Sequence, residues 1–271
     1  MQAPLLKIET LDVGYRNRQG SKAVVTAINA TLCAGEVVAL IGMNGAGKST
    51  LLRTLSAFQP PLSGRVEFAM GDVGTLSAAE LAKCVSVVLT ENSFATITVE
   101  ELVSLGRTPY TGFWGRLTAA DSSVVVAAME RMDVAHLAGR VVTTLSDGER
   151  QKCLIAKAIA QQTPLMLLDE PTAFLDFRSK VQLFRTLRTL AADAGKAVVV
   201  STHDIEMALR FATKLWLICD GHLYEGSAQR LAADGMLQRF IDGDGIVYDK
   251  ENNRIEITQG GAFDGRSKNM N

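Results

Sequence analysis

A glycine-rich loop at residues 42–49 constrains the fold of this chain more than any other feature. The loop reads Gly-Met-Asn-Gly-Ala-Gly-Lys-Ser and matches in full the pattern GxxxxGK followed by Ser or Thr. The apolar run Val37–Ile41 before it predicts a strand buried on both faces, and Lys48–Ser56 after it carries leucines at helical spacing. In this setting glycines let backbone N–H groups surround a phosphate, and the start of a helix favours negative charge. A glycine-rich turn without a ligand is the alternative, and the correct flanks on both sides disfavour it.

The side chains of this loop indicate nucleotide binding. Lys48 is placed to neutralise phosphate oxygens, and the Ser49 hydroxyl can ligate Mg²⁺. The predicted nucleotide-binding residues of this segment are Gly42, Asn44, Gly45, Ala46, Gly47, Lys48, Ser49 and Thr50.

Two acidic residues directly follow a second expected buried strand. Leu165–Leu168 is an apolar run, and Asp169 and Glu170 follow it directly. An Asp at the carboxyl end of a strand beside a phosphate loop can hold Mg²⁺, and a neighbouring carboxylate can orient or deprotonate the attacking water. Strands often end in acidic residues at a solvated edge, so the pair alone is a weak signal. Together with the loop it predicts nucleotide hydrolysis, with Asp169 as a metal ligand and Glu170 as the catalytic base.

The order of expected strands and helices indicates an α/β protein with a helical insertion. Near the N-terminus, Leu5–Val13 and Ala23–Leu32 alternate as half-buried strands do, whereas residues 98–161 have helical character. We place one domain at 1–241, with a core (1–90 and 162–241) and a helical subdomain (91–161), before a partly frayed extension at 242–271. The other expected strands are Val85–Leu89, Ala197–Ser201, Leu215–Cys219 and a weak pair at Ile246–Tyr248 and Arg254–Ile257. The other expected helices are Glu100–Leu105, Ala119–Met132, Asp147–Ala160, Arg178–Ala192 and Ile205–Phe211.

Composition excludes several classes of function. Hydrophobic residues make up 47% and charged residues 21% of the chain, which is a globular balance. The net charge of −1 argues against a nucleic-acid binder that works through bulk positive charge. No apolar run reaches the roughly 18 to 20 residues of a membrane span, and residues 1–10 lack the pattern of a signal peptide. The four cysteines lie far apart and suggest neither a zinc site nor disulfides, so we expect a soluble cytoplasmic protein.

A third motif makes the assignment specific. Leu145–Gln151 reads Leu-Ser-Asp-Gly-Glu-Arg-Gln, and Ser146 with Glu149 three residues later predicts a capping box at a helix start. The same segment resembles the signature motif, LSGGQ, of ATP-binding cassette (ABC) ATPases. That resemblance covers about residues 5–240 in the correct order. It implies a P-loop core with an N-terminal antiparallel β lobe and an inserted helical subdomain, and it implies ATP and Mg²⁺ as the cofactors.

The resemblance assigns further residues. Tyr15 is similar to the aromatic residue that stacks on adenine, and His203 is similar to the switch histidine that contacts the γ-phosphate. Asp176 lies in a segment similar to the D-loop, which communicates between two nucleotide sites. In this family two copies pair head to tail, so each ATP lies between the phosphate loop of one copy and the signature of the other. The signature residues implied to contact nucleotide are Ser146, Asp147, Gly148 and Glu149.

Two positions depart from the family pattern. Where the family has a Gln that senses Mg²⁺, this chain has Glu91, which the resemblance places as a catalytic residue and metal ligand. Asp147 and Glu149 replace a Gly and a Gln of the signature. Added carboxylates near a polyphosphate raise the electrostatic cost of closing two copies over ATP, and we expect Mg²⁺ to offset it. Asp147 instead could merely complement the helix dipole.

The helical segment narrows the type of ABC protein. Residues 98–110 and 113–118 are similar to ATPases of importers for ferric siderophores, haem and vitamin B12; the alternative is a generic amphipathic helix with an aromatic loop. The resemblance implies a separate membrane permease, indirect coupling to a substrate-binding protein, and a peripheral place on the cytoplasmic face of the membrane. If Glu91–Trp114 forms the groove that docks the permease, reversing the charge of Arg107 should uncouple transport and leave the basal ATPase activity intact. Loss of both activities in a folded variant would instead indicate a structural role for Arg107.

Other functions stay open at this point. A soluble ABC ATPase acting in DNA repair or translation is one alternative, although such proteins tend to carry coiled-coil insertions or tandem cassettes. An ABC transporter for another substrate is a second. A P-loop GTPase would need an NKxD-type guanine reader, and none is found.

Overall fold

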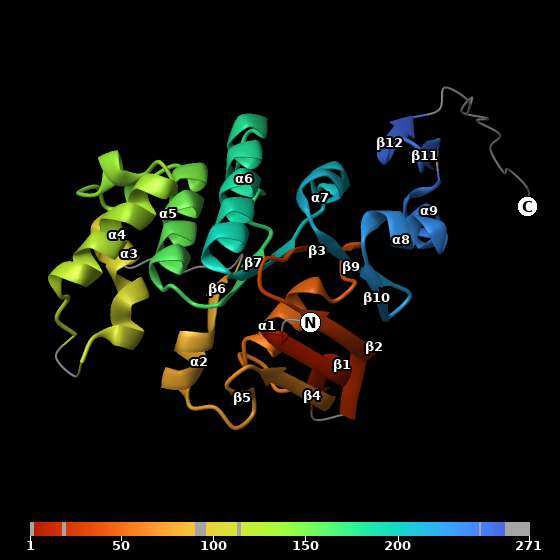
Figure 1. Cartoon of the computed structure of the whole chain (residues 1–271), viewed down its shortest axis with the longest axis horizontal. Helices are drawn as coiled ribbons and strands as arrows, with labels where there is room; N and C mark the ends of the chain where they lie inside the picture. The colour runs from red at the N-terminus through yellow and green to blue at the C-terminus, as the bar shows by residue number, and fades with distance from the viewer. Residues whose placement is uncertain (1–2, 18–19, 90–95, 113–114, 244, 258–271) are drawn as a thin grey trace, which may run out of the picture.

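A six-stranded, mostly parallel sheet forms the centre of the computed structural model, which describes residues 3–17, 20–89, 96–112, 115–243 and 245–257 (Figure 1). The strand order is β10-β9-β3-β8-β7-β6, and only the pairing of β10 with β9 is antiparallel. Three of the strands, β3, β7 and β8, are buried along their whole length, as strands covered on both faces are. The six strands of this sheet are β3 (Val37–Gly42), β6 (Val85–Val88), β7 (Leu165–Asp169), β8 (Ala197–Ser201), β9 (Lys214–Cys219) and β10 (His222–Gly226).

Alternate side chains of these strands face two different layers. Val38 and Leu40 of β3 pack with α1 (Lys48–Leu55) and the N-terminal strands. Met166 and Leu168 of β7 pack on the other face with the helices of the insertion and with α6 (Phe177–Ala194). A third apolar cluster lies under the C-terminal helices α7 (Ile205–Phe211), α8 (Ala228–Ala233) and α9 (Met236–Ile241).

An antiparallel lobe covers one side of the central sheet, in the lower part of Figure 1. Its strand order is β2-β1-β4-β5, which confirms the two strands expected near the N-terminus and adds two. Lys214 of β9 ties this lobe to the central sheet, because its Nζ donates to the Thr31 carbonyl at 3.0 Å and to Glu225 at 3.2 Å. The bounds are β1 (Leu6–Asn17), β2 (Gly20–Leu32), β4 (Ser63–Phe68) and β5 (Gly71–Asp72), and α2 (Ala78–Cys84) leads from the lobe to β6.

The expected helical insertion lies at one end of the molecule, beside α6 (Figure 1). Its three longer helices start with complete capping boxes, formed by Thr98 with Glu101, Thr118 with Asp121, and Ser146 with Glu149. Each box satisfies backbone N–H groups that a helix start leaves unpaired. The elements are α3 (Val99–Ser104), η1 (Leu105–Tyr110), α4 (Ala119–Arg131), η2 (Ala135–Leu137), η3 (Val142–Thr144) and α5 (Asp147–Ala160), where η marks a 3₁₀ helix.

A two-stranded hairpin follows the C-terminal helices and confirms the expected weak strand pair. It consists of β11 (Ile246–Asp249) and β12 (Arg254–Ile257), and Tyr248 anchors it in the apolar cluster under α9. The last fourteen positions, 258–271, lie outside the described residues. In the described part of the chain, none of the helices combines the length and apolar character that a bilayer crossing needs.

Candidate nucleotide site

The glycine-rich loop connects β3 to α1 and has the backbone geometry that its glycines predict. Gly45 and Gly47 have φ angles of 76° and 106°, in the left-handed region that side chains disfavour. A Cβ on Gly47 would lie 2.8 Å from a Val24 methyl group, so glycine is required there for space as well. Lys48 folds back along the loop, and its Nζ donates to the carbonyl oxygens of Gly42 at 2.8 Å and Met43 at 3.2 Å.

Residues from five separate segments line one pocket around this loop, with Val24 of β2 among them. Glu170 from the turn after β7, His203 from the segment after β8 and Tyr15 from β1 join the loop side chains there. Of the loop positions predicted to bind nucleotide, Gly42 and Ala46 do not line this pocket; Ala46 lines a neighbouring cavity with Gly45. The full lining is Tyr15, Val24, Asn44, Gly45, Gly47, Lys48, Ser49, Thr50, Glu170 and His203.

One serine hydroxyl holds both carboxylate-bearing residues at the end of β7. Ser201 Oγ, at the end of β8, donates to Asp169 Oδ1 at 2.6 Å and accepts from the Glu170 backbone N–H at 2.9 Å. Asp169 is buried, whereas the Glu170 carboxylate contacts the His203 Nε2 atom. Glu170 has a φ of 48°, which is unusual for a residue with a side chain and is found mainly where function or packing enforces it. The role of Ser201 is not predicted from the sequence, where its only signal is its place at the end of a strand that neighbours β7.

The electrostatic surroundings of Lys48 link the loop to these carboxylates. Burial lowers the pKa of Lys48 below its usual 10.5, while the charges of Glu170 and Asp169 act in the opposite direction. The ammonium group of Lys48 and the two carboxylates are therefore close enough to interact electrostatically. Hydrolysis of a polyphosphate requires charged groups gathered in this way.

Tyr15 presents an aromatic ring at the rim of the pocket. Its hydroxyl lies 2.8 Å from Thr50 Oγ1, and 55% of the residue is exposed. An exposed ring fixed at one end offers a flat surface on which a base can stack.

The signature residues lie apart from this pocket, at the start of α5. Glu149 Oε2 accepts from the Ser146 backbone N–H at 2.9 Å and from its hydroxyl at 2.8 Å, and these bonds lower the pKa of Glu149. Asp147 is mostly exposed and accepts from Arg150 Nη1 at 2.9 Å. A Cβ on Gly148 would lie 3.0 Å from the Phe174 carbonyl oxygen, so the signature packs against the segment 173–176.

Asp176 has a local structural role in addition to the one that the resemblance implies. Its Oδ1 accepts from the Ser179 backbone N–H at 2.7 Å and caps α6. Phe174 and Phe177 on either side of it are exposed.

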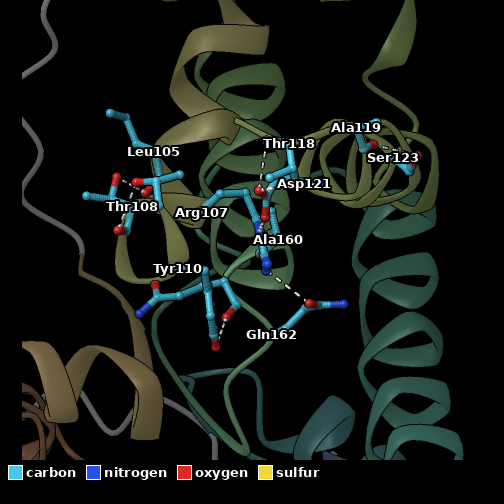
Figure 2. Close-up of polar contacts among 12 residues, drawn as sticks. Leu105, Arg107, Thr108, Tyr110, Thr118, Ala119, Asp121, Ser123, Ala160 and Gln162 are labelled. Carbon is cyan, nitrogen blue, oxygen red and sulfur yellow. Dashed lines mark hydrogen bonds and ion pairs between the residues drawn. The ribbon is translucent and has the colours of Figure 1, made fainter. Parts of the chain in front are cut away.

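Arg107 lies within a network of polar contacts in the helical insertion (Figure 2). It is buried, its Nε donates to Asp121 Oδ1 at 2.9 Å, and its Nη1 donates to the Ala160 carbonyl at 2.8 Å. Its guanidinium carbon also lies 4.2 Å from the centre of the Tyr110 ring. This buried network favours the structural role for Arg107 over the role in coupling, and it could not be read from the sequence because the partners come from α4 and α5, which are distant in sequence. Three other predicted positions, Glu91, Phe113 and Trp114, lie outside the described residues.

The donor set of the pocket suits a hard cation rather than zinc or iron. Within the described ranges, no three His, Cys, Asp or Glu side chains gather in a metal-binding cluster. The pocket instead offers the Ser49 hydroxyl in its lining, and the Asp169 carboxylate lies at the end of β7, which β8 separates from β3. Few protein oxygens complemented by phosphate and water are typical of Mg²⁺.

Comparison with known proteins supports one family. The family described as ABC transporter matches residues 25–173. An uncharacterized ABC transporter ATP-binding protein of Methanocaldococcus jannaschii is 42% identical over 79% of this chain and 73% of its own length. The hemin import ATP-binding protein HmuV of Streptomyces coelicolor is 40% identical over 84% of this chain and 81% of its own length.

One further relative and one solved structure are also similar to this chain. The cobalamin import ATP-binding protein BtuD of Halobacterium salinarum is 39% identical over 82% of this chain, which spans only 56% of that relative's length. A dimeric, post-hydrolysis ATP-binding cassette with bound ADP and phosphate has a TM-score of 0.74 at 26% identity, covering 82% of this chain and 98% of its own. With the loop, the carboxylates and the signature in the expected order, this chain belongs to the ABC transporter family and is one of its ATPase cassettes.

Proposed function

We propose that this chain is the ATP-hydrolysing subunit of an importer for an iron chelate, haem or cobalamin, working through a separate membrane permease. The observation that carries the ATPase part is the single pocket in which Lys48, Glu170 and His203 meet. The importer class rests on the residues of the helical segment and on the names of the relatives with 39% to 40% identity.

In this proposal the loop glycines and Asn44 surround the phosphates while Lys48 neutralises them. Tyr15 stacks on the adenine, and Thr50 holds the Tyr15 hydroxyl in place. Ser49 and Asp169 are the groups that would hold Mg²⁺, with Glu91 as a further ligand. The metal would neutralise charge that develops on the phosphates.

Glu170 is the proposed general base. Its backbone is fixed by Ser201 and its carboxylate points to His203, so it is held at the pocket where a water would attack the terminal phosphate. His203 would contact that phosphate and hold the Glu170 carboxylate in position.

A second copy of the chain is needed to complete the site. Ser146, Asp147, Gly148 and Glu149 do not line the pocket that contains Lys48 within one chain. A head-to-tail pair would place the signature of one copy against the ATP of the other, and Asp176 would lie near the junction. The dimeric arrangement of the solved cassette supports this proposal.

The remaining partners follow from the importer class. The cassette would sit on the cytoplasmic face of the membrane against a permease that receives its cargo from a substrate-binding protein. Nucleic acid is not an expected partner, because the net charge is −1.

Substitution of Glu170 by Gln tests the catalytic assignment. Glu170→Gln removes the base but leaves the phosphate contacts, so we expect ATP binding to persist and turnover to fall by at least about a hundredfold. Lys48→Ala is the matched control, and it should weaken ATP binding itself. Equilibrium binding of a fluorescent ATP analogue and phosphate release measure the two effects. Near-normal phosphate release by Glu170→Gln would remove Glu170 from its role.

Uptake by cells tests the cargo separately. A strain lacking this chain should lose uptake of one of three labelled compounds, a ferric hydroxamate, hemin or cyanocobalamin. The wild-type chain should restore uptake, and Glu170→Gln should not. If all three compounds enter the deletion strain normally, the proposed class of cargo is wrong. The assignment as an ATPase is then unaffected, because the Glu170→Gln experiment tests it independently.

A further inference from the structure

A cavity of about 310 Å³ lies between the helical insertion and the core, far along the chain from the phosphate loop. Its apolar lining includes Val124 and Ala127 of α4 and Leu190 of α6. Ile159 near the end of α5 and Met166 of β7 also line it. The volume is at the lower end of the range for small-molecule sites, about 300–1,000 Å³, and the walls are mostly apolar as in such sites.

This cavity is separate from the nucleotide pocket. Met166 is at the amino end of β7, whereas Asp169 and Glu170 are at its carboxyl end. No residue that lines the cavity also lines the pocket around Lys48. The cavity therefore opens at the opposite edge of the sheet.

Lys196, Arg131 and Gln162 bring hydrogen-bond donors to the cavity, and the fourth polar side chain of its lining, Ser123, donates its hydroxyl to the Ala119 carbonyl at 3.0 Å. Lys196 Nζ donates to the Thr163 carbonyl at 2.6 Å and has further N–H groups, and Arg131 brings a second cation from the end of α4. Across the ranges that the structure describes, neither cation takes part in an ion pair, and no carboxylate lines the cavity. Gln162 accepts from Arg107 through Oε1 at 2.9 Å, so the amide nitrogen lies on the side away from Arg107 (Figure 2).

The two cations act on each other. Burial lowers the pKa of Lys196 from 10.5 to about 8, and the charge of Arg131 contributes to the shift. Two positive groups at one apolar cavity with no acidic partner are stabilised by an anion that enters between them.

We propose that this cavity binds a small amphipathic anion, a carboxylate with an alkyl chain of medium length. The carboxylate lies between Lys196 and Arg131 and accepts from the Gln162 amide. The alkyl chain packs against Val124, Ala127 and Leu190. Because α4 belongs to the insertion and Lys196 to the core, the bound anion bridges the two.

Calorimetric titration of the purified chain with decanoate, below its micelle concentration and at pH 7, tests this proposal. We expect saturable binding to one site, with an affinity lowered about tenfold in Lys196→Gln and in Arg131→Gln, since each removes one charge-assisted bond. Arg188→Gln is the matched control, because Arg188 is an exposed arginine of α6 outside the cavity. Decanol, which lacks the charge, should bind at least about tenfold more weakly than decanoate.

The pH dependence gives a second readout. Between pH 7 and 9.5 Lys196 loses its proton, whereas arginine side chains keep their charge. The nearest other charged positions in the sequence are Glu130 and Asp133 beside Arg131 and Asp193 before Lys196, and Lys152 lines the adjoining cavity. Decanoate affinity should therefore fall across this range in the wild-type chain and in Arg188→Gln. It should stay nearly constant in Lys196→Gln.

A variant that fills the cavity distinguishes binding in the cavity from binding elsewhere on the surface. Ala127→Trp places a large side chain at the cavity without changing charge, and it should abolish decanoate binding while ATPase activity is retained. Decanoate binding that survives in Ala127→Trp, or that is equal for decanol and unchanged in both charge variants, would overturn the proposal. Absence of saturable binding to the folded wild-type chain would also overturn it.

Discussion

Asp147 stands where the signature motif that this segment resembles has a glycine, and its contacts bear on the effect of its charge. The side chain is exposed at the first turn of α5 and paired with Arg150. Arg150 holds the carboxylate near the segment expected to meet a second copy. Its effect on ATP-driven closure therefore depends on how much of its charge reaches the polyphosphate.

We expect Asp147→Gly to tighten ATP-dependent dimerisation and to lower the Mg²⁺ concentration needed for ATPase activity. A carboxylate beside a polyphosphate raises the energy of the closed pair, and a divalent cation offsets it. Mg²⁺ titrations of ATPase activity measure the effect.

Asp147→Asn is the matched control for that substitution. It removes the charge and keeps a side chain that suits a helix start, so it should shift the Mg²⁺ titration in the same direction as glycine does. Superimposable titration curves for all three chains would mean that Asp147 only complements the dipole of α5.

At the scale of elements, the network around Arg107 joins η1, α4 and the end of α5. Hydrogen bonds from Thr118 and from Arg107 lower the pKa of Asp121 from 3.8 to about 2. A carboxylate with a depressed pKa in the folded state stabilises the fold when ionised. That stabilisation is complete above about pH 4 and is lost as the pH falls toward 2.

We therefore expect Asp121→Asn to lower the thermal midpoint at pH 6 and to lower it progressively less at pH 4 and pH 3. Asp193→Asn, at an exposed position of α6, is the control and should shift the midpoint little at any pH. Circular dichroism melts provide the measurement. A deficit of Asp121→Asn that stays constant down to pH 3 would contradict the assigned ion pair.

The elements also show which predictions a sequence can support. The loop, β3 and α1 were predicted correctly because their residues interact with near neighbours and carry a recognisable pattern. β4 was missed because its residues, Ser63–Phe68, include only two strongly apolar side chains. The environment of Arg107 and the role of Ser201 could not be predicted, since both depend on partners that only the tertiary fold brings together.

At the scale of the whole molecule, the separation of signature and pocket predicts complementation between two inactive chains. Lys48→Ala damages the pocket and Ser146→Arg damages the signature, so each homodimer should lack turnover. A mixed dimer contains one intact composite site, because a head-to-tail interface pairs the intact pocket of one chain with the intact signature of the other.

Equal mixing should recover about a quarter of wild-type ATPase activity, since half of the dimers are mixed and one of their two sites is intact. Phosphate release, measured on the two variants alone and together, provides the comparison. Full activity of Ser146→Arg alone, or no recovery in a mixture that forms dimers with ATP, would contradict the composite site.

The position of β8 between β3 and β7 has a consequence for how the protein is synthesised. β8 is made last of the three, after the helical insertion, yet it is the strand that holds the other two side by side. A nascent chain that ends before Ser201 contains the loop and both carboxylates but lacks the complete strand that pairs with both β3 and β7. We therefore expect affinity for ATP to arise late in translation, so that the nucleotide stabilises chains that have completed the sheet. Cellular ATP in this way favours finished cassettes over partly folded ones.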